Sequence, residues 1–232
     1  MSTKPHIHVI ILAAGCGKRM PKKRFKQFFL LEKKPIVMHT ILKLFKIIPK
    51  ANFNIVLPEN KINYWKSLCK KYNFLVPHTI FKGGETRFFS VKNTISSLCF
   101  KQNDLVFIHD SVRPFFSKQL IKRLINSAQK KGHSVPVIEI KDSLRRKNKN
   151  IDNTISVDRS NFLLTQTPQV FRAEIIKKAY SRKSNQIKKT DDVSLIEEFI
   201  FPINLIYGEE LNFKITNQKD WELAQIIAPN FL

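Results

Sequence analysis

Short apolar runs alternate along this chain with longer stretches in which apolar residues recur every three or four positions. The first run, 6–12, has no polar break after its second histidine, as expected of a parallel strand buried on both faces. The helical repeat is clear in 36–45. The same patterns predict strands at 54–57, 78–81, 104–109, 134–138 and 203–207, and helices at 59–72, 85–100, 117–131, 173–182, 192–199 and 218–227. This order predicts a three-layer α/β fold with a largely parallel sheet. Ser117 is expected to cap the helix that follows it.

One segment, 139–160, departs from the alternation. Two β-type stretches flank a basic, turn-forming centre at 147–153, which indicates a hairpin whose tip buries little of its own surface. Exposed hairpins usually need a partner surface. We therefore expect a protruding β-arm within a single domain that spans 1–232, and we favour a dimerisation arm over a flexible loop.

The composition fits one globular domain. Of the 232 residues, 43% are hydrophobic, which is enough for a core, and no apolar stretch approaches the ~18–20 residues that span a bilayer. Cys16, Cys69 and Cys99 are too widely spaced for a disulfide framework or a metal-binding pair. We expect a soluble, reduced, cytoplasmic protein with no membrane partner.

The net charge of +23 favours polyanionic partners such as nucleotides, phosphorylated metabolites or nucleic acid. However, the lysines are dispersed along the chain in pairs instead of forming one stripe or tail. We therefore favour a compositional bias with solvated charged faces over a selected polyanion surface.

The loop after the first strand carries the strongest chemical signal. Gly15 and Gly17 stand where the strand turns toward a helix, and small residues there let backbone N–H groups approach a phosphate. Met20 replaces the third glycine of a dinucleotide fingerprint, and Arg19 replaces the hydroxyl residue of a Walker A loop. With Lys26, Arg19 brings fixed cations near a bound polyphosphate.

Two further turns follow predicted strands. The Gly-Gly turn before Glu85 opens a helix and could present backbone groups to a base edge, with Ser90 within reach of a sugar or base. Asp110 ends a strand, where ligands bind in open α/β sheets, and could hold a metal or a substrate hydroxyl. Arg113 could instead fix the loop, and His109 is interpreted as structural. His6 and His8, with no third ligand nearby, are also interpreted as structural.

Later polar segments at 154–159, 164–169, 190–192 and 212–216 are interpreted as loop ends that could bind a second anion. Spacing alone assigns them no role.

Taken together, eight motifs resemble, in order and over nearly the whole chain, the 2-C-methyl-D-erythritol 4-phosphate cytidylyltransferase family. They are AAG-x-G-x-Arg-Met, Lys-Gln, Gly-Gly-x-x-Arg, His-Asp-x-x-Arg-Pro, Val-Asp-Arg, Thr-Pro-Gln, Thr-Asp-Asp and Lys-Ile-Thr. The resemblance implies a Rossmann-like nucleotidyltransferase fold with a mixed, mostly parallel sheet, and a homodimer joined through the β-arm. It implies transfer of CMP from CTP to methylerythritol phosphate, with Mg²⁺ as cofactor.

The same resemblance implies roles for single residues. It makes Arg19 and Lys26 the catalytic pair. It implies CTP contacts from Ala13, Ala14, Gly15, Gly17, Gly84, Glu85 and Ser90, and substrate contacts from Asp110, Ser143, Arg159, Thr190 and Lys214. Asp110 would hold the metal, unless the triphosphate alone carries it. Ser143 and Arg159 would reach the substrate bound to the other subunit. This sequence has Leu12, Ser143 and Glu85 where relatives often have Pro, Thr and Asp. None of these departures removes a charge that the chemistry needs.

Three alternatives stay open. A cytidylyltransferase for ribitol 5-phosphate or another polyol phosphate would share the fold and the loop. A guanylyl- or uridylyltransferase for a sugar would need a different base pocket at 83–85. The charge could also mark a nucleic-acid-binding protein, but the chain has no signature of such a module, so we expect no specific nucleic acid partner.

Overall fold

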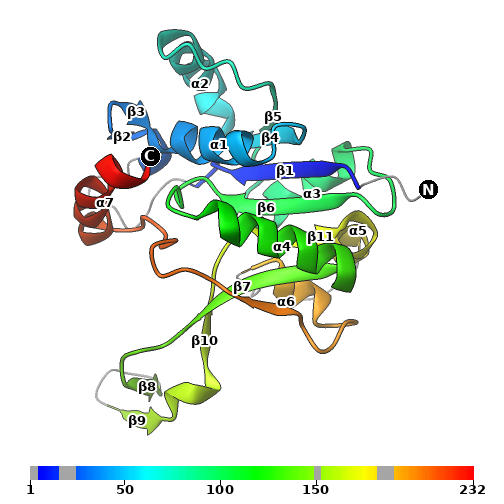
Figure 1. Ribbon diagram of the computed structural model, residues 1–232, viewed down its shortest axis with the longest axis vertical. Coiled ribbons are helices and arrows are strands. Elements are labelled where there is room, and N and C mark those ends of the chain that lie inside the picture. The colour runs from blue at the N-terminus through cyan, green and yellow to red at the C-terminus, as the bar shows by residue number, and fades with distance from the viewer. Residues whose placement is uncertain (1–4, 16–24, 149–152, 182–190) are drawn as a thin grey trace.

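In a computed structural model, described here for residues 5–15, 25–148, 153–181 and 191–232, the chain forms a central sheet with helices on both faces (Figure 1). The strands β5, β4, β1 and β6 lie side by side and are parallel. Beyond β6 comes β11, which runs antiparallel to both β6 and β7. The strand β7 also pairs with β10, antiparallel, and with β12, parallel. The predicted mixed, mostly parallel α/β sheet is therefore confirmed.

The strands of this sheet are β1 (Ile7–Leu12), β4 (Asn52–Leu57), β5 (His78–Lys82), β6 (Leu105–Asp110), β7 (His133–Glu139), β10 (Leu163–Thr165), β11 (Gln169–Arg172) and β12 (Leu205–Tyr207). The helices are α1 (Ile36–Ile47), α2 (Ile62–Lys71), α3 (Arg87–Ser97), α4 (Lys118–Lys131), α5 (Ala173–Ser181), α6 (Val193–Ile196) and α7 (Gln218–Phe231). Short β2 (Leu30–Leu31) and β3 (Lys34–Pro35) form a separate ribbon before α1.

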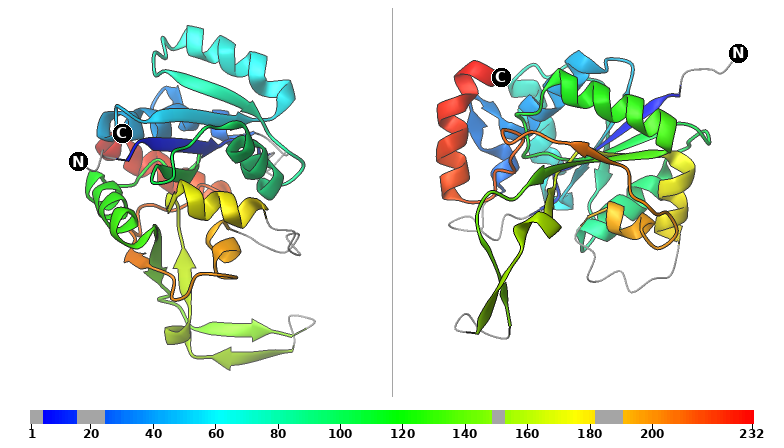
Figure 2. Two further views of the ribbon diagram at one scale, coloured as in Figure 1. Left: turned by 90° about the vertical axis from the view of Figure 1, so that its right-hand side faces the viewer. Right: turned by 60° about the horizontal axis from the view of Figure 1, so that its bottom comes forward.

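The two faces of the sheet carry separate apolar clusters. Val9 and Ile11 of β1 point to the face that α1, α2 and α4 cover, whereas Ile10 points to the face under α3, α5 and α6. This alternation explains why the strand is apolar at consecutive positions. A third cluster packs α7 through Ala224 and Ala228 against the β2–β3 region. Figure 2 shows the helices on either side of the sheet.

Several helix ends follow from local sequence. Ser117 accepts a hydrogen bond from the backbone N–H of Leu120 (3.0 Å), which confirms the predicted cap of α4. Gly132 ends α4 with φ of +85°, a conformation that a residue with a side chain adopts at a cost. Asn217 and Asp220 form a reciprocal capping box at the start of α7.

The prediction was wrong at 164–169. The sequence predicts loop ends here, but Leu164 and Thr165 belong to β10 and Gln169 begins β11, and both strands run antiparallel to β7. The runs are short and mixed in polarity, so they lack the apolar signal of β1. The predicted helix at 192–199 is also shorter, because α6 covers only Val193–Ile196.

The segment 139–160 contains a hairpin of β8 (Leu144–Lys147) and β9 (Thr154–Val157), which pair antiparallel in a two-stranded sheet of their own. In Figures 1 and 2 it extends away from the central sheet. Its use as a dimerisation arm stays a prediction. Within the described residues, no helix is both long and apolar enough to cross a membrane.

Candidate active site

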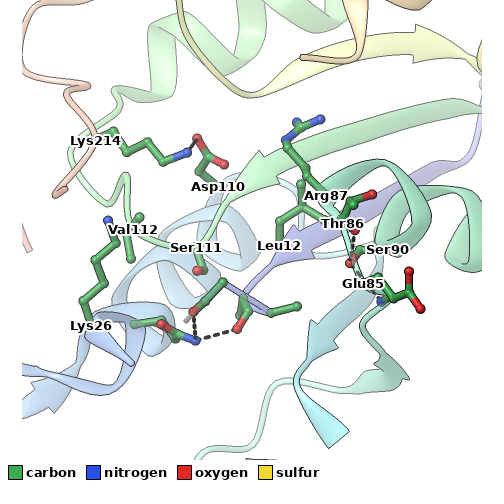
Figure 3. Close-up of a pocket in the computed structure, with 15 residues that line it drawn as sticks. Leu12, Lys26, Glu85, Thr86, Arg87, Ser90, Asp110, Ser111, Val112 and Lys214 are labelled. Carbon is green, nitrogen blue, oxygen red and sulfur yellow. Dashed lines mark hydrogen bonds and ion pairs between the residues drawn. The ribbon is translucent and has the colours of Figure 1, made fainter. Parts of the chain in front are cut away.

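A cleft of about 450 Å³ opens where β1 and β6 end (Figure 3). It lies at the carboxyl edge of the parallel strands, where open α/β sheets bind ligands. Its walls come from five parts of the chain, and its lining residues are Leu12, Ala13, Ala14, Gly15, Lys26, Gln27, Gly84, Glu85, Thr86, Arg87, Ser90, Asp110, Ser111, Val112 and Lys214.

The turn after β1 is held by a side chain that follows it in sequence. Gln27, which is buried, donates from Nε2 to the carbonyl oxygens of Ala13 (2.6 Å) and Gly15 (3.1 Å). A Cβ placed on Gly15 would meet nothing within 4 Å. The backbone at Gly15 therefore borders open space, as a phosphate-binding turn requires.

The Gly83-Gly84 turn packs against the turn after β1. A Cβ on Gly83 would lie 2.5 Å from Cβ of Ala14, and one on Gly84 would lie 2.6 Å from Cβ of Phe89. Ser90 accepts a hydrogen bond from the N–H of Gly84 (3.0 Å) and donates to the carbonyl of Thr86 (2.9 Å). Both glycines are thus demanded by close packing, and the Ser90 hydroxyl fixes the turn.

Asp110 is buried at the end of β6 and is surrounded by cations. Its Oδ2 lies 2.9 Å from Nζ of Lys214 and 3.2 Å from Nε of Arg113, which also donates to the carbonyl of Asn212. Burial alone would raise the pKa of Asp110, but the charges of Lys214, Arg113 and Arg87 outweigh it and hold that pKa well below its usual range. Asp110 is therefore ionised and orients Lys214 toward the cleft.

His109 precedes Asp110 and points into the protein. Its Nε2 lies 3.1 Å from the carbonyl oxygen of Arg113, which can only accept, so Nε2 carries the proton. Its Nδ1 then accepts from the Thr167 hydroxyl (2.9 Å), which in turn accepts from the Asp110 N–H (3.0 Å). Burial lowers the pKa of His109 to about 3, so the ring is neutral and structural, as predicted.

Sequence reasoning missed an ion pair that joins two motifs. Arg87, at the start of α3, donates to both oxygens of Asp192 (2.8 and 2.5 Å), and the Asp192 side chain has no exposed surface. Tyr180 also donates to Asp192 (2.5 Å). The side-chain oxygen Oε1 of Gln169 accepts hydrogen bonds from the backbone N–H groups of Asp192 and Val193 at the start of α6. The Gly-Gly-x-x-Arg, Thr-Pro-Gln and Thr-Asp-Asp motifs therefore meet in one buried network.

Lys26 reaches the cleft from a 3₁₀ helix at Lys26–Phe28 and is almost wholly buried. Its Nζ lies 3.5 Å from the carbonyl oxygen of Thr216, two residues after Lys214. Lys26 and Lys214 therefore come from opposite ends of the sequence to one side of the cleft, as Figure 3 shows. Together they make that side strongly positive.

The structure brings most of the predicted site residues together. The cleft contains Ala13, Ala14, Gly15, Lys26, Gly84, Glu85, Ser90, Asp110 and Lys214. Ser143 and Arg159 are exposed on the hairpin segment, outside this cleft, and Arg159 donates to the carbonyl of Lys141. The remaining predicted site residues, Gly17, Arg19 and Thr190, lie outside the described residues.

The fold and the cleft place this protein in the class of nucleotidyltransferases. At one cleft, its Rossmann-like sheet carries a small-residue turn, a Gly-Gly turn and converging lysines. The comparisons name the family within this class. The family model for 2-C-methyl-D-erythritol 4-phosphate cytidylyltransferase matches residues 7–229. The chain belongs to this family.

Curated relatives and solved structures agree. The enzyme of that name from Azobacteroides pseudotrichonymphae is 42% identical over 221 residues, covering 95% of this chain and 97% of the relative. The one from Phocaeicola vulgatus is 38% identical over 220 residues, covering 95% and 98%. The crystal structure of 4-diphosphocytidyl-2C-methyl-D-erythritol synthase from Anaerococcus prevotii matches with a TM-score of 0.81 and 26% identity over 97% of each chain. That of the Thermus thermophilus cytidylyltransferase matches with a TM-score of 0.79 and 28% identity over 97% of this chain and 99% of that one.

Proposed function

We propose that this cleft transfers the cytidylyl group of CTP to 2-C-methyl-D-erythritol 4-phosphate, releasing pyrophosphate and giving 4-diphosphocytidyl-2-C-methyl-D-erythritol. One observation carries the assignment to this cleft. The turn at Ala13–Gly15, the buried Lys26 and the Asp110–Lys214 pair all line it. A triphosphate and a phosphate monoester need such cations on a shared surface.

The reaction requires charge stabilisation more than proton transfer. The attacking oxygen belongs to a phosphate that is already ionised at neutral pH, so no general base is needed. The barrier comes from bringing two anions together and from the charge that builds up around the α-phosphate. Lys26 and Arg19 are the proposed catalytic residues, since fixed cations lower such a barrier without reorganising.

The nucleotide is proposed to lie against two turns. The backbone at Ala13, Ala14, Gly15 and Gly17 would take the triphosphate, and Gly84, Glu85 and Ser90 would surround the cytosine and ribose. In support, Gly84 and Ser90 are held in fixed positions by their mutual hydrogen bond. Glu85 is exposed at the cleft and can move to meet a base edge.

Mg²⁺ fits the residues at the cleft, and we propose it as the cofactor. This ion is usually held by one or two carboxylates together with substrate phosphates and water. Asp110 supplies an ionised carboxylate at the cleft, and no cluster of three or more ligand-type side chains occurs among the described residues. Asp110 and the triphosphate would therefore hold the ion, which would neutralise phosphate charge. Asp110 and Lys214 would also orient the sugar phosphate.

We propose that a partner subunit completes the binding site for the second substrate. Ser143 and Arg159 are exposed on the hairpin segment and do not line their own chain's cleft, so in a homodimer they could reach the substrate of the partner. Thr190 is proposed to contact the same phosphate. A cytoplasmic location is also proposed, because Cys69 and Cys99 are free thiols.

Mixed dimers test the shared site. Lys26→Ala and Arg159→Ala chains would each be inactive alone, whereas a mixture contains one site with both residues intact. Partial activity on mixing is expected. A mixture that stays inactive, although differently tagged chains of the two variants co-purify as mixed dimers, would contradict the shared site.

Pyrophosphate release tests the reaction itself. The purified chain with Mg²⁺ and CTP is expected to turn over methylerythritol phosphate but not ribitol 5-phosphate, and to prefer CTP over UTP. Turnover with ribitol 5-phosphate alone would assign the cleft to the other polyol.

A further inference from the structure

A second cleft of about 450 Å³ lies between the β2–β3 ribbon, α1, the first residue of α4 and the end of α7. It shares no lining residue with the catalytic cleft. Figure 1 shows the end of α7 beside β2, β3 and α1, so segments from both halves of the chain enclose it. Nothing in the proposed reaction uses this cleft.

Four lysines surround the second cleft: Lys34 from β3, Lys43 and Lys46 from α1, and Lys118 from α4. None of them forms an ion pair with a carboxylate of the described residues. Other lysines of the described chain do have such partners, for example Lys82 with Glu59 at 2.6 Å. Among the lining residues, Glu32 carries a side-chain carboxylate and Leu232 carries the α-carboxylate of the chain, so four ammonium groups face two carboxylates. The cleft therefore has a local excess of positive charge.

Lys43 is the most constrained of the four. Its Nζ donates to the carbonyl oxygen of Phe231 (3.0 Å) and lies 5.5 Å from the centre of the Phe116 ring. Burial lowers the pKa of Lys43, with Lys46 adding to the effect and Glu209 opposing it. An ammonium that has lost part of its water gains more from an incoming anion than one that is fully hydrated.

The remaining walls are apolar. Leu42 and Ile47 of α1 face the cleft together with Phe231 and Leu232 at the end of the chain. These side chains cannot bind an anion, but they can bury an apolar group attached to one. The lining thus combines a cationic rim with an apolar wall, which is the chemistry of an amphiphilic anion site.

We propose that this second cleft binds a phosphate monoester that carries an apolar group. Lysines bind phosphate groups as compact point charges, and a phosphate dianion can offset more of them than a singly charged carboxylate. Esters with a larger apolar group bury more area against the apolar wall and should therefore bind more tightly.

Hexyl phosphate and methyl phosphate are suitable probes, titrated by calorimetry at fixed ionic strength. The proposed reaction product, 4-diphosphocytidyl-2-C-methyl-D-erythritol, is kept at a saturating concentration, so that both the nucleotide part and the sugar-phosphate part of the catalytic cleft are filled. Hexyl phosphate is expected to bind once per chain, and at least tenfold more tightly than methyl phosphate, since each buried methylene is worth about fourfold. Equal affinity for the two esters would overturn the proposal.

Paired substitutions locate the binding. Lys43→Gln with Lys118→Gln is expected to weaken hexyl phosphate at least tenfold, because two charge-assisted contacts are lost. The control pair, Lys66→Gln with Lys70→Gln on α2, makes the same change in net charge. It is expected to leave the affinity for hexyl phosphate within about twofold of that of the parent chain. Glutamine can still donate to the Phe231 carbonyl, so both variants should keep the fold and the CTP turnover of the parent.

Two results would contradict the site. Hexyl phosphate could bind the Lys43/Lys118 variant as tightly as the parent chain. It could also be weakened equally by both pairs, which would mean that only the overall positive charge attracts it. The single substitution Lys118→Gln, at an exposed position, gives a second test and is expected to weaken binding by several-fold.

Discussion

The ion pair between Arg87 and Asp192 makes a strong prediction about stability. Asp192→Ala removes a fully buried carboxylate that accepts two guanidinium hydrogen bonds and one from Tyr180. Breaking a buried ion pair by removing one partner costs about 3–5 kcal/mol of unfolding free energy. The Tyr180 hydroxyl, which would lose its acceptor, adds about 1–3 kcal/mol if it stays unsatisfied. The Arg87 side chain is 30% exposed and can turn to water, which reduces the first cost. We expect about 3–5 kcal/mol in total.

Arg87→Ala is expected to cost as much or more, because it leaves the carboxylate of Asp192 buried without its cation. Urea unfolding of both single variants and of the double variant Arg87→Ala/Asp192→Ala gives the coupling free energy between the two side chains. The double variant should lose about 2–3 kcal/mol less unfolding free energy than the two single variants lose together, because an apolar pair leaves no charge unpaired. Tyr180→Phe, as a control, should cost only about 1 kcal/mol.

Additive costs, within about 0.5 kcal/mol, would refute this reasoning, because they would mean that the two side chains act independently. The same variants report on the site. Arg87 opens the helix that follows the Gly-Gly turn, so a displaced α3 should raise the KM for CTP in both single variants.

Three other outcomes are expected. Lys26→Ala and Arg19→Ala should each lower kcat by ~10²–10³ with little change in the Kd of CTP, measured by single turnover and calorimetry; a loss confined to KM would contradict a transition-state role. Because burial lowers the pKa of His109 to about 3, only the unfolded chain gains this proton just below pH 6.5, so stability falls as the pH drops. The step from pH 7 to pH 5 should cost about 2 kcal/mol through this residue, and a His109→Gln profile as steep as the parent's in urea would disprove it. Gly84→Ala places a Cβ 2.6 Å from Cβ of Phe89, so the KM for CTP should rise, and an unchanged KM would show that the turn tolerates the shift.

The sequence was most informative where chemistry stands next to a regular strand. The turn at Ala13–Gly15 and Asp110 at the end of β6 can be located because each follows an apolar run that is easily recognised. The turn at Gly84 follows the shorter and more polar β5, and its glycine pair is the signal that marks it. Since parallel strands share one carboxyl edge, their meeting in one cleft could be foreseen.

Contacts between distant segments could not be foreseen in the same way. Arg87 and Asp192 are 105 positions apart, and Lys26 and Thr216 are 190 apart. No local pattern relates such residues. The sequence predicts a loop at Gln169 because β11 is only four residues long, and the place of this strand in the sheet depends on β6 and β7, not on its own periodicity. Only the motif Thr-Pro-Gln hinted that this segment had a fixed role.

The position of β11 also has a consequence for synthesis of the chain. The strands β6 and β7 are joined through β11, whose first residue follows the end of β6 by about 60 positions. At ~5–20 residues per second, a ribosome needs roughly 3–12 s to add them. During that time, β6 has no partner on one side, and an unpaired strand edge invites association with other chains. The middle of the sheet is therefore completed only when the late strand β11 pairs with β6. The yield of folded protein in cells should be sensitive to the rate of translation between these two strands.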